Sequence, residues 1–98
     1  DPSRWWIIRA EGTDAGCLLL ADHPTRDHFE LVYMGITPQF RGRGWGEELV
    51  QFALWKTAQA GRRHLILAVD AANDPAVRIY CRSGFEPVRR QTVCLKFL

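Results

Sequence analysis

The sequence predicts one domain of the α+β class over residues 1–98, with two helices packed on a mixed β-sheet. Three observations indicate this class. Two segments with apolar residues at helical spacing are set among runs rich in β-favouring residues. The run 65–69 is apolar throughout, which is typical of a strand inside a sheet. Strand 28–37, helix 44–60 and strand 63–70 also fit one right-handed parallel crossover. The predicted order is β-β-β-α-β-α-β-β.

Three strands are expected before the first helix. The run 5–8 contains two tryptophans and two isoleucines, and it stops at the turn-forming residues 11–14. Strand character resumes at 17–21, so the two runs form a hairpin. After a second turn, the apolar segment 28–37 ends before Pro38 and gives the third strand.

Two helices are expected. In 44–60 apolar residues recur at helical spacing, glutamates fall in the first turn and Gly61 follows the last turn. The second helix begins with Asp74 as its cap and Pro75 at its first position, and it stops at Gly84. One face of this short helix is apolar and therefore packs on the sheet.

The remaining strands complete the sheet. The continuous apolar run 65–69 predicts a central strand that is buried on both faces. Residues 85–88 and 92–98 predict two closing strands, because apolar and polar residues alternate in the second of them.

Composition places the chain among compact domains. Hydrophobic residues make up 47% and charged residues 24%, and the net charge of +2 is too small to indicate a nucleic-acid or membrane partner. Cys17, Cys81 and Cys94 form no Cys-x-x-Cys pair, so we interpret them as buried free thiols and expect no metal site. His23 and the other two histidines have no partner at ligand spacing and are interpreted as surface or loop residues.

No apolar run reaches the ~20 residues of a membrane span, and the first residues are not a signal peptide. We therefore expect a cytoplasmic protein without a membrane partner. The chain opens on Asp1 instead of Met, so we expect it to be a fragment that has lost residues upstream.

The glycine-rich segment Arg41-Gly42-Arg43-Gly44-Trp45-Gly46 lies between a predicted strand and a predicted helix. Its backbone N–H groups can converge on an anion, aided by the helix dipole, while the arginines supply positive charge. The dinucleotide-binding pattern would need glycine where the chain has Glu47, and the Gly-Lys-Ser/Thr of a P-loop is absent. An ordinary glycine-rich turn with exposed arginines is the alternative, and the segment alone does not decide between them.

The segment from Ile36 to Leu49 resembles motif A of the GNAT superfamily, the Gcn5-related N-acetyltransferases. That motif has R/Q-x-x-G-x-G/A after a strand that ends in a hydrophobic-x-Pro step. The segment from Leu67 to Phe85 resembles motif B, with Asn, Ala, Tyr and Gly-Phe at the familiar spacings. Two motifs in the right order make a chance match improbable, and the resemblance implies the three-layer GNAT fold.

The resemblance implies that the chain binds acetyl-CoA as a cosubstrate and transfers its acetyl group to an amine. The pantetheine arm would pair with the backbone near Met34 and Ile36, where strands 28–37 and 63–70 splay apart. The diphosphate would lie on the amides of Arg41, Gly42, Arg43, Gly44, Trp45 and Gly46.

The resemblance also assigns roles to three side chains. Asn73 would contact the pantetheine, or alternatively serve only as a helix-entry residue. Tyr80 would place its hydroxyl near the thioester sulfur and donate a proton, or alternatively be a packed aromatic. Glu30 is the candidate base, because burial would raise its pKa, although a solvent-facing position at the start of its strand fits nearly as well.

The sequence departs from the family pattern in two ways. The first strand and the first two helices of a GNAT domain have no counterpart, and these helices commonly form one wall of the acceptor site. Either the chain has lost them or a partner subunit, as in a homodimer, supplies the wall. Trp45 replaces the usual aliphatic residue. We expect its side chain to pack beneath the loop; the alternative is that it narrows the site.

Two other functions remain open at this level. Without the acceptor wall, the chain could be a non-catalytic module that binds acyl-CoA or dimerises. Nucleic-acid binding through Arg41, Arg43, Arg62 and Arg63 has charge but no stacking aromatics to support it, so no nucleic-acid partner is expected. The acceptor, a small-molecule or peptide amine, and the length of the acyl group are not identified.

Overall fold

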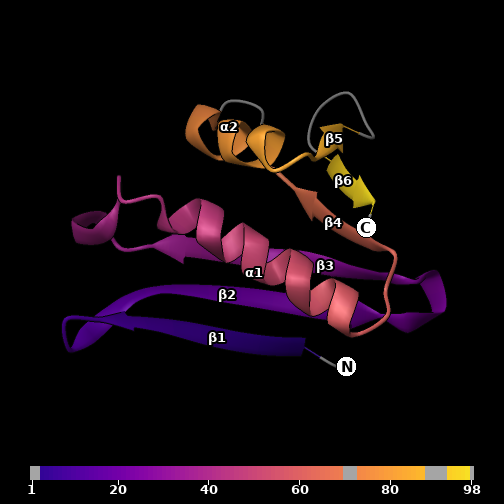
Figure 1. Cartoon of the computed structure of the whole chain (residues 1–98), viewed down its shortest axis with the longest axis horizontal. Helices are drawn as coiled ribbons and strands as arrows, with labels where there is room; N and C mark the ends of the chain where they lie inside the picture. Colours follow the sequence, from indigo (N-terminus) through magenta and orange to yellow (C-terminus); the bar gives the residue numbers. More distant parts are fainter. Residues whose placement is uncertain (1–2, 70–72, 88–92, 98) are drawn as a thin grey trace.

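The computed structural model describes residues 3–69, 73–87 and 93–97, which form one sheet with two helices (Figure 1). The elements are β1 (Ser3–Ala10), β2 (Thr13–His23), β3 (His28–Ile36), α1 (Trp45–Gln59), β4 (His64–Ala68), α2 (Asp74–Arg82), β5 (Glu86–Pro87) and β6 (Val93–Phe97). The predicted order of strands and helices is confirmed.

The sheet is mixed, as predicted. Its strand order is β1-β2-β3-β4-β6-β5, so β1 and β5 are its edges and β4 is central. β3 and β4 run parallel on either side of the α1 crossover, whereas the other neighbours are antiparallel. The parallel crossover predicted around α1 is therefore present.

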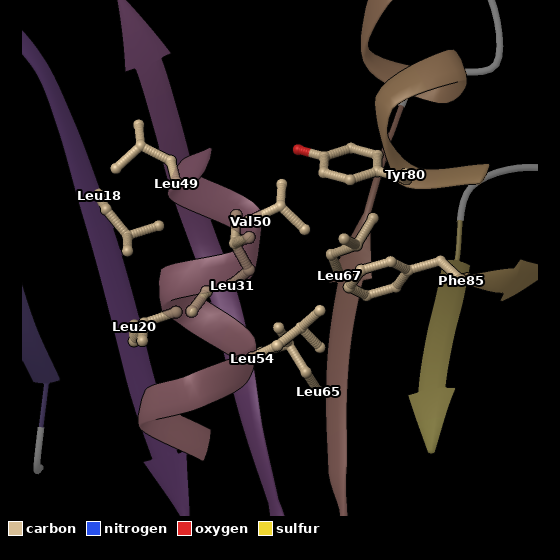
Figure 2. Close-up of a cluster of buried hydrophobic side chains, with 11 residues drawn as sticks. Leu18, Leu20, Leu31, Leu49, Val50, Leu54, Leu65, Leu67, Tyr80 and Phe85 are labelled. Atoms are coloured by element: carbon tan, nitrogen blue, oxygen red, sulfur yellow. The ribbon is translucent and has the colours of Figure 1, made fainter. Parts of the chain in front are cut away.

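The core lies between one face of the sheet and the two helices. Alternate residues of β2 and β4 face α1, and the cluster also contains residues of both helices (Figure 2). Its members include Leu18, Leu20, Leu31, Leu49, Val50, Leu54, Leu65, Leu67, Tyr80 and Phe85. Both described helices thus cover the same face, and the described residues form two layers.

The opposite face of the sheet, here called the open face, has exposed aromatic residues. Trp6 packs against Phe52 of α1, so its neighbour Trp5 points the other way, where it is 58% exposed and contacts Tyr33. β4 was predicted to be buried on both faces. That prediction is wrong for this face, because Ile66 is only partly buried while Leu65 on the helix side is fully buried.

One further expectation needs correction. Cys17 is partly exposed and Cys81 is exposed, so these free thiols are not buried. The side chain of Cys94 lies outside the described part of the chain. Among the described residues, no helix has the length and apolar character needed to cross a membrane.

An ion pair fastens the end of β2 to the turn between α1 and β4. Arg62 binds both carboxylate oxygens of Asp22, at 2.7 and 3.0 Å. This hydrogen bonding lowers the pKa of the Asp22 carboxyl below its usual range. The pair therefore stabilises the fold at neutral pH, and the contribution is lost as the pH falls through the folded-state pKa.

Replacing Asp22 by Asn should consequently lower the Tm at pH 7. The difference from the wild-type chain should shrink as the pH is lowered into the acid range, because protonated Asp22 no longer carries a charge. Thermal melts of both proteins over a pH series test this. A difference that stays constant down to the acid limit would contradict the electrostatic origin.

Candidate functional site

A cavity of about 780 Å³ opens between β3, β4 and the starts of α1 and α2. Its origin is the limited pairing of the two parallel strands, which ends at Leu31 opposite Leu67. Beyond this point, here called the vertex, residues 32–36 of β3 continue without β4 beside them. The backbone on that side of β3 therefore faces the cavity, and the predicted splaying of the strands is observed.

The structure brings most of the predicted site residues to this cavity. Residues from four segments line it, and the predicted members among them are Met34, Ile36, Arg41, Gly42, Gly44, Trp45, Gly46, Asn73 and Tyr80. Arg43 and Glu30 are not among the lining residues.

The three glycines of the loop are needed for different structural reasons. Gly42 and Gly44 both have φ +80°, a left-handed conformation that side chains other than glycine adopt only with strain. Gly46 lies in α1, where a Cβ would be 3.0 Å from the Ile79 side chain. Two glycines therefore shape the loop, and the third lets α2 approach α1 closely.

The first turn of α1 is open at the cavity. Gly44 is the N-cap residue, and no side chain caps this end of the helix. N–H groups at a helix start and the positive end of its dipole favour an anion. Glu47 in the same turn opposes this, but it forms an ion pair with Arg82 of α2, another cavity-lining residue.

The two loop arginines point to different places. Arg41 lines the cavity and donates from Nε to the Ile36 carbonyl oxygen at 2.9 Å. Arg43 instead donates to Glu11 in the β1–β2 turn and lies over the Phe40 ring, 4.9 Å from its centroid. The expectation that both side chains supply charge to the anion site is therefore wrong for Arg43.

Trp45 packs as expected and still reaches the site. Its ring stacks on Phe40 with centroids 5.1 Å apart and an interplanar angle of 15°. Phe40 is buried, so the stack supports the loop from below. Because Trp45 also lines the cavity, it both supports and narrows the site.

Asn73 is the N-cap of α2, one residue before the predicted cap Asp74. Its Oδ1 accepts a hydrogen bond from the Ala76 backbone N–H at 3.4 Å. The prediction of Asp74 as the cap is therefore wrong. The helix-entry role considered for Asn73 is present, and its side chain also borders the cavity.

Tyr80 is both a core residue and a cavity residue. It is 7% exposed, and its ring meets Phe85 edge-on with centroids 5.7 Å apart. Figure 2 shows the ring reaching from α2 toward α1, with its hydroxyl group near Val50. The packing holds the ring in place within the wall of the cavity.

Glu30 lies on the open face, immediately before the vertex residue Leu31. Its side chain is 43% exposed, so the burial on which its predicted role depended is absent from the described structure. Its Oε1 is 3.0 Å from Nε2 of His23. His23 and His28 lie in strands with their rings 4.9 Å apart, and both are partly exposed, so they are surface residues of the sheet and not loop residues.

One feature of the site was not predicted. Glu47 and Arg82 join the two helices at the cavity, and they are 35 residues apart in the sequence. The two residues lie in different helices, so no local sequence pattern indicates the pair. Among the described residues, no group of three His, Cys, Asp or Glu side chains is arranged to hold a metal ion.

Comparison with known proteins identifies the family. The model of the acetyltransferase (GNAT) family matches residues 1–85. Mycothiol acetyltransferase of Corynebacterium efficiens is 38% identical over 64 residues, which are 65% of this chain and 22% of that protein. Mycothiol acetyltransferase of Actinosynnema mirum is 33% identical over 84 residues, which are 82% of this chain and 27% of that protein.

The chain thus spans about a quarter of the length of these two relatives. Among solved structures, the PaiA N-acetyltransferase of Thermoplasma acidophilum in complex with coenzyme A superposes with a TM-score of 0.85 at 18% identity. The match covers 98% of this chain and 61% of that one. This likeness concerns the fold, whereas the family model covers most of the sequence. The chain therefore belongs to the GNAT acetyltransferase family.

Proposed function

We propose that this chain transfers an acetyl group from acetyl-CoA to a primary amine by direct attack in a ternary complex. One observation carries the proposal: the glycine-rich loop, the uncapped start of α1, the unpaired segment of β3 and Tyr80 all border a single cavity. Family membership and the coenzyme A held by the PaiA protein support the choice of donor. The relatives named mycothiol acetyltransferase favour a small-molecule acceptor over a peptide.

The donor would lie along the cavity from the loop to the vertex. Its diphosphate would accept hydrogen bonds from the backbone of residues 41–46, with Arg41 as the nearby cation. Its pantetheine arm would pair with β3 near Met34 and Ile36 as an added strand. The Ile36 carbonyl already accepts from Arg41, but a carbonyl oxygen has two lone pairs and can accept twice.

The reacting atoms would meet at the vertex. The thioester arrives from the helix side, beside Tyr80, whereas the amine can approach from the open face, beside Glu30. Adjacent Cα atoms are about 3.8 Å apart, and successive side chains of a strand point to opposite faces. As a base, Glu30 would therefore act on the amine from the open face. As an acid, Tyr80 would act on the thioester sulfur from the helix side.

The proposed transfer moves two protons from the amine nitrogen and releases one of them to solvent. Glu30 takes one proton from the ammonium group, and the amine lone pair then attacks the thioester carbon. When the C–S bond breaks, the sulfur takes the proton of Tyr80, and the second proton of the nitrogen returns to the tyrosine oxygen. Glu30 releases its proton to solvent. Holding amine and thioester together supplies much of the rate.

The proposal is tested with acetyl-CoA and a panel of primary amines. Calorimetric titration should show binding of acetyl-CoA, and thiol release should rise above hydrolysis in the presence of an accepted amine. Absence of binding by a folded sample would reject the donor site. Binding with no turnover on any amine would instead support the non-catalytic acyl-CoA module.

Asn73 offers a test that separates folding from binding. Asn73→Ala removes the cap of α2 and should lower the free energy of unfolding by about 1 kcal/mol. Asn73→Asp keeps a capping oxygen but loses the amide donor, so its stability should stay near wild type. If the amide contacts the pantetheine, both variants should weaken acetyl-CoA binding by about threefold to tenfold. Thermal melts and calorimetric titrations measure the two effects, and unchanged affinity in Asn73→Asp would confine Asn73 to capping.

A further inference from the structure

We propose that His23 is a positioning residue for Glu30 and that the two side chains form one proton-accepting unit at the vertex. This inference rests on the proposed function, because it concerns the base of that reaction. Nε2 of His23 lies 3.0 Å from Oε1 of Glu30, and the pair joins two neighbouring strands.

The strand register brings the two side chains together. Glu30 pairs with Ala21 of β2, and His23 is two residues further along the same strand. Residues two apart in a strand share a face, so His23 and Glu30 are diagonal neighbours on the open face. Their side chains are 39% and 43% exposed, which keeps a path to solvent for the proton.

A single hydrogen bond is enough to orient the base. When His23 donates from Nε2 to Oε1, the carboxylate is held in one rotamer and Oε2 is left to accept the proton of the ammonium group. Orientation of this kind matters because a base must lie within hydrogen-bond reach of the proton it removes. His23 therefore acts through Glu30 and does not itself touch the reacting atoms.

The surrounding charges suit this role. Burial, followed by the charge of His23, lowers the pKa of His28, which keeps the His28 ring neutral beside the pair. His64 of β4 is opposite His28 in the register, and Asp22 on the other face is bound to Arg62.

A double-mutant cycle tests the coupling, with thiol release measured for the best primary amine of the panel. His23→Ala and Glu30→Gln should each lower kcat by at least about tenfold, while the double variant should be no slower than the slower single variant. The KM for acetyl-CoA should change by less than about twofold in all three, because neither residue lines the donor cavity. Multiplying effects in the double variant, or wild-type kcat in His23→Ala, would overturn the inference.

A conservative variant separates positioning from mere packing. Glutamine can place a donor nitrogen where His23 has Nε2, so His23→Gln should recover kcat to within about threefold of wild type. Loss of kcat in His23→Gln equal to that in His23→Ala would count against the hydrogen bond as the cause.

The inference can fail independently of the proposed function. If no amine is acetylated, NMR spectra of the His23 ring in the wild type and in Glu30→Gln still report the contact. The chemical shift of the His23 Nε2 nitrogen should change in the variant, because the carboxylate 3.0 Å from it is replaced by an amide. An unchanged chemical shift would overturn the pairing even in an active enzyme.

Discussion

Tyr80→Phe is expected to lower kcat by about 10²-fold, the lower end of the range for losing a general acid. The phenyl ring keeps the edge contact with Phe85 and the burial of Tyr80, so the cavity wall should persist. The substitution removes the proton proposed for the departing sulfur. Affinity for acetyl-CoA should therefore stay within about twofold of wild type, since the donor makes its main contacts with the loop and with β3.

The measurements are steady-state thiol release with an accepted amine and calorimetric titration with acetyl-CoA. Tyr33→Phe is a matched control, because it removes the hydroxyl of the other tyrosine that borders the cavity, which is 53% exposed and packs against Trp5 on the open face. Its kcat should change by less than about threefold. Equal rates for Tyr80→Phe and wild type would restrict Tyr80 to packing.

The elements of this fold are predictable because their patterns are local. Periodicity and turn-forming residues place the ends of α1 and β4 within a few residues of the observed ones. The glycine loop is predictable for the same reason, since its conformation and its place before a helix are encoded within six consecutive residues. The anion site at the start of α1 thus follows from short-range sequence.

Contacts between distant segments are harder to predict. Arg43 turns away from the cavity because Glu11 lies beside it in space, 32 residues away in sequence. His23 meets Glu30 because of a strand register that a bulge between Leu19 and Leu20 shifts by one residue. A histidine in a run of polar residues gives no local sign of such a partner.

The number of buried faces of a strand is harder to predict than the strand itself, but easier than a contact between distant segments. The apolar run 65–69 does not by itself tell how many faces are covered, because coverage depends on what packs above each side. Helices cover one face of β4, and Ile66 on the other face is partly exposed. The same openness leaves Glu30 more exposed than its predicted role as a buried base required. The hydrogen bond from His23 instead offers a means of orienting its carboxylate.

Gly44→Ala is expected to weaken acetyl-CoA binding by at least about tenfold. At φ +80° an alanine is strained by about 1–2 kcal/mol, and the loop can relieve this strain by leaving the conformation that presents its N–H groups. Binding must then restore that conformation, and each 1.4 kcal/mol of cost lowers affinity tenfold. Because Gly44 borders the cavity with open space at its Cβ position, the added methyl group would also project where the diphosphate is proposed to lie.

Gly61→Ala supplies the matched control at the other end of α1. Gly61 has φ +78° and equally open space around its Cβ position, but it does not line the cavity. The two variants should therefore lose similar stability in thermal melts, since each forces alanine into the left-handed region. Calorimetric titration should separate them, with Gly61→Ala within about twofold of the wild-type Kd. If both variants bound acetyl-CoA equally well, the diphosphate would not depend on the conformation of the 41–46 loop, and the donor would have to enter the cavity from another side.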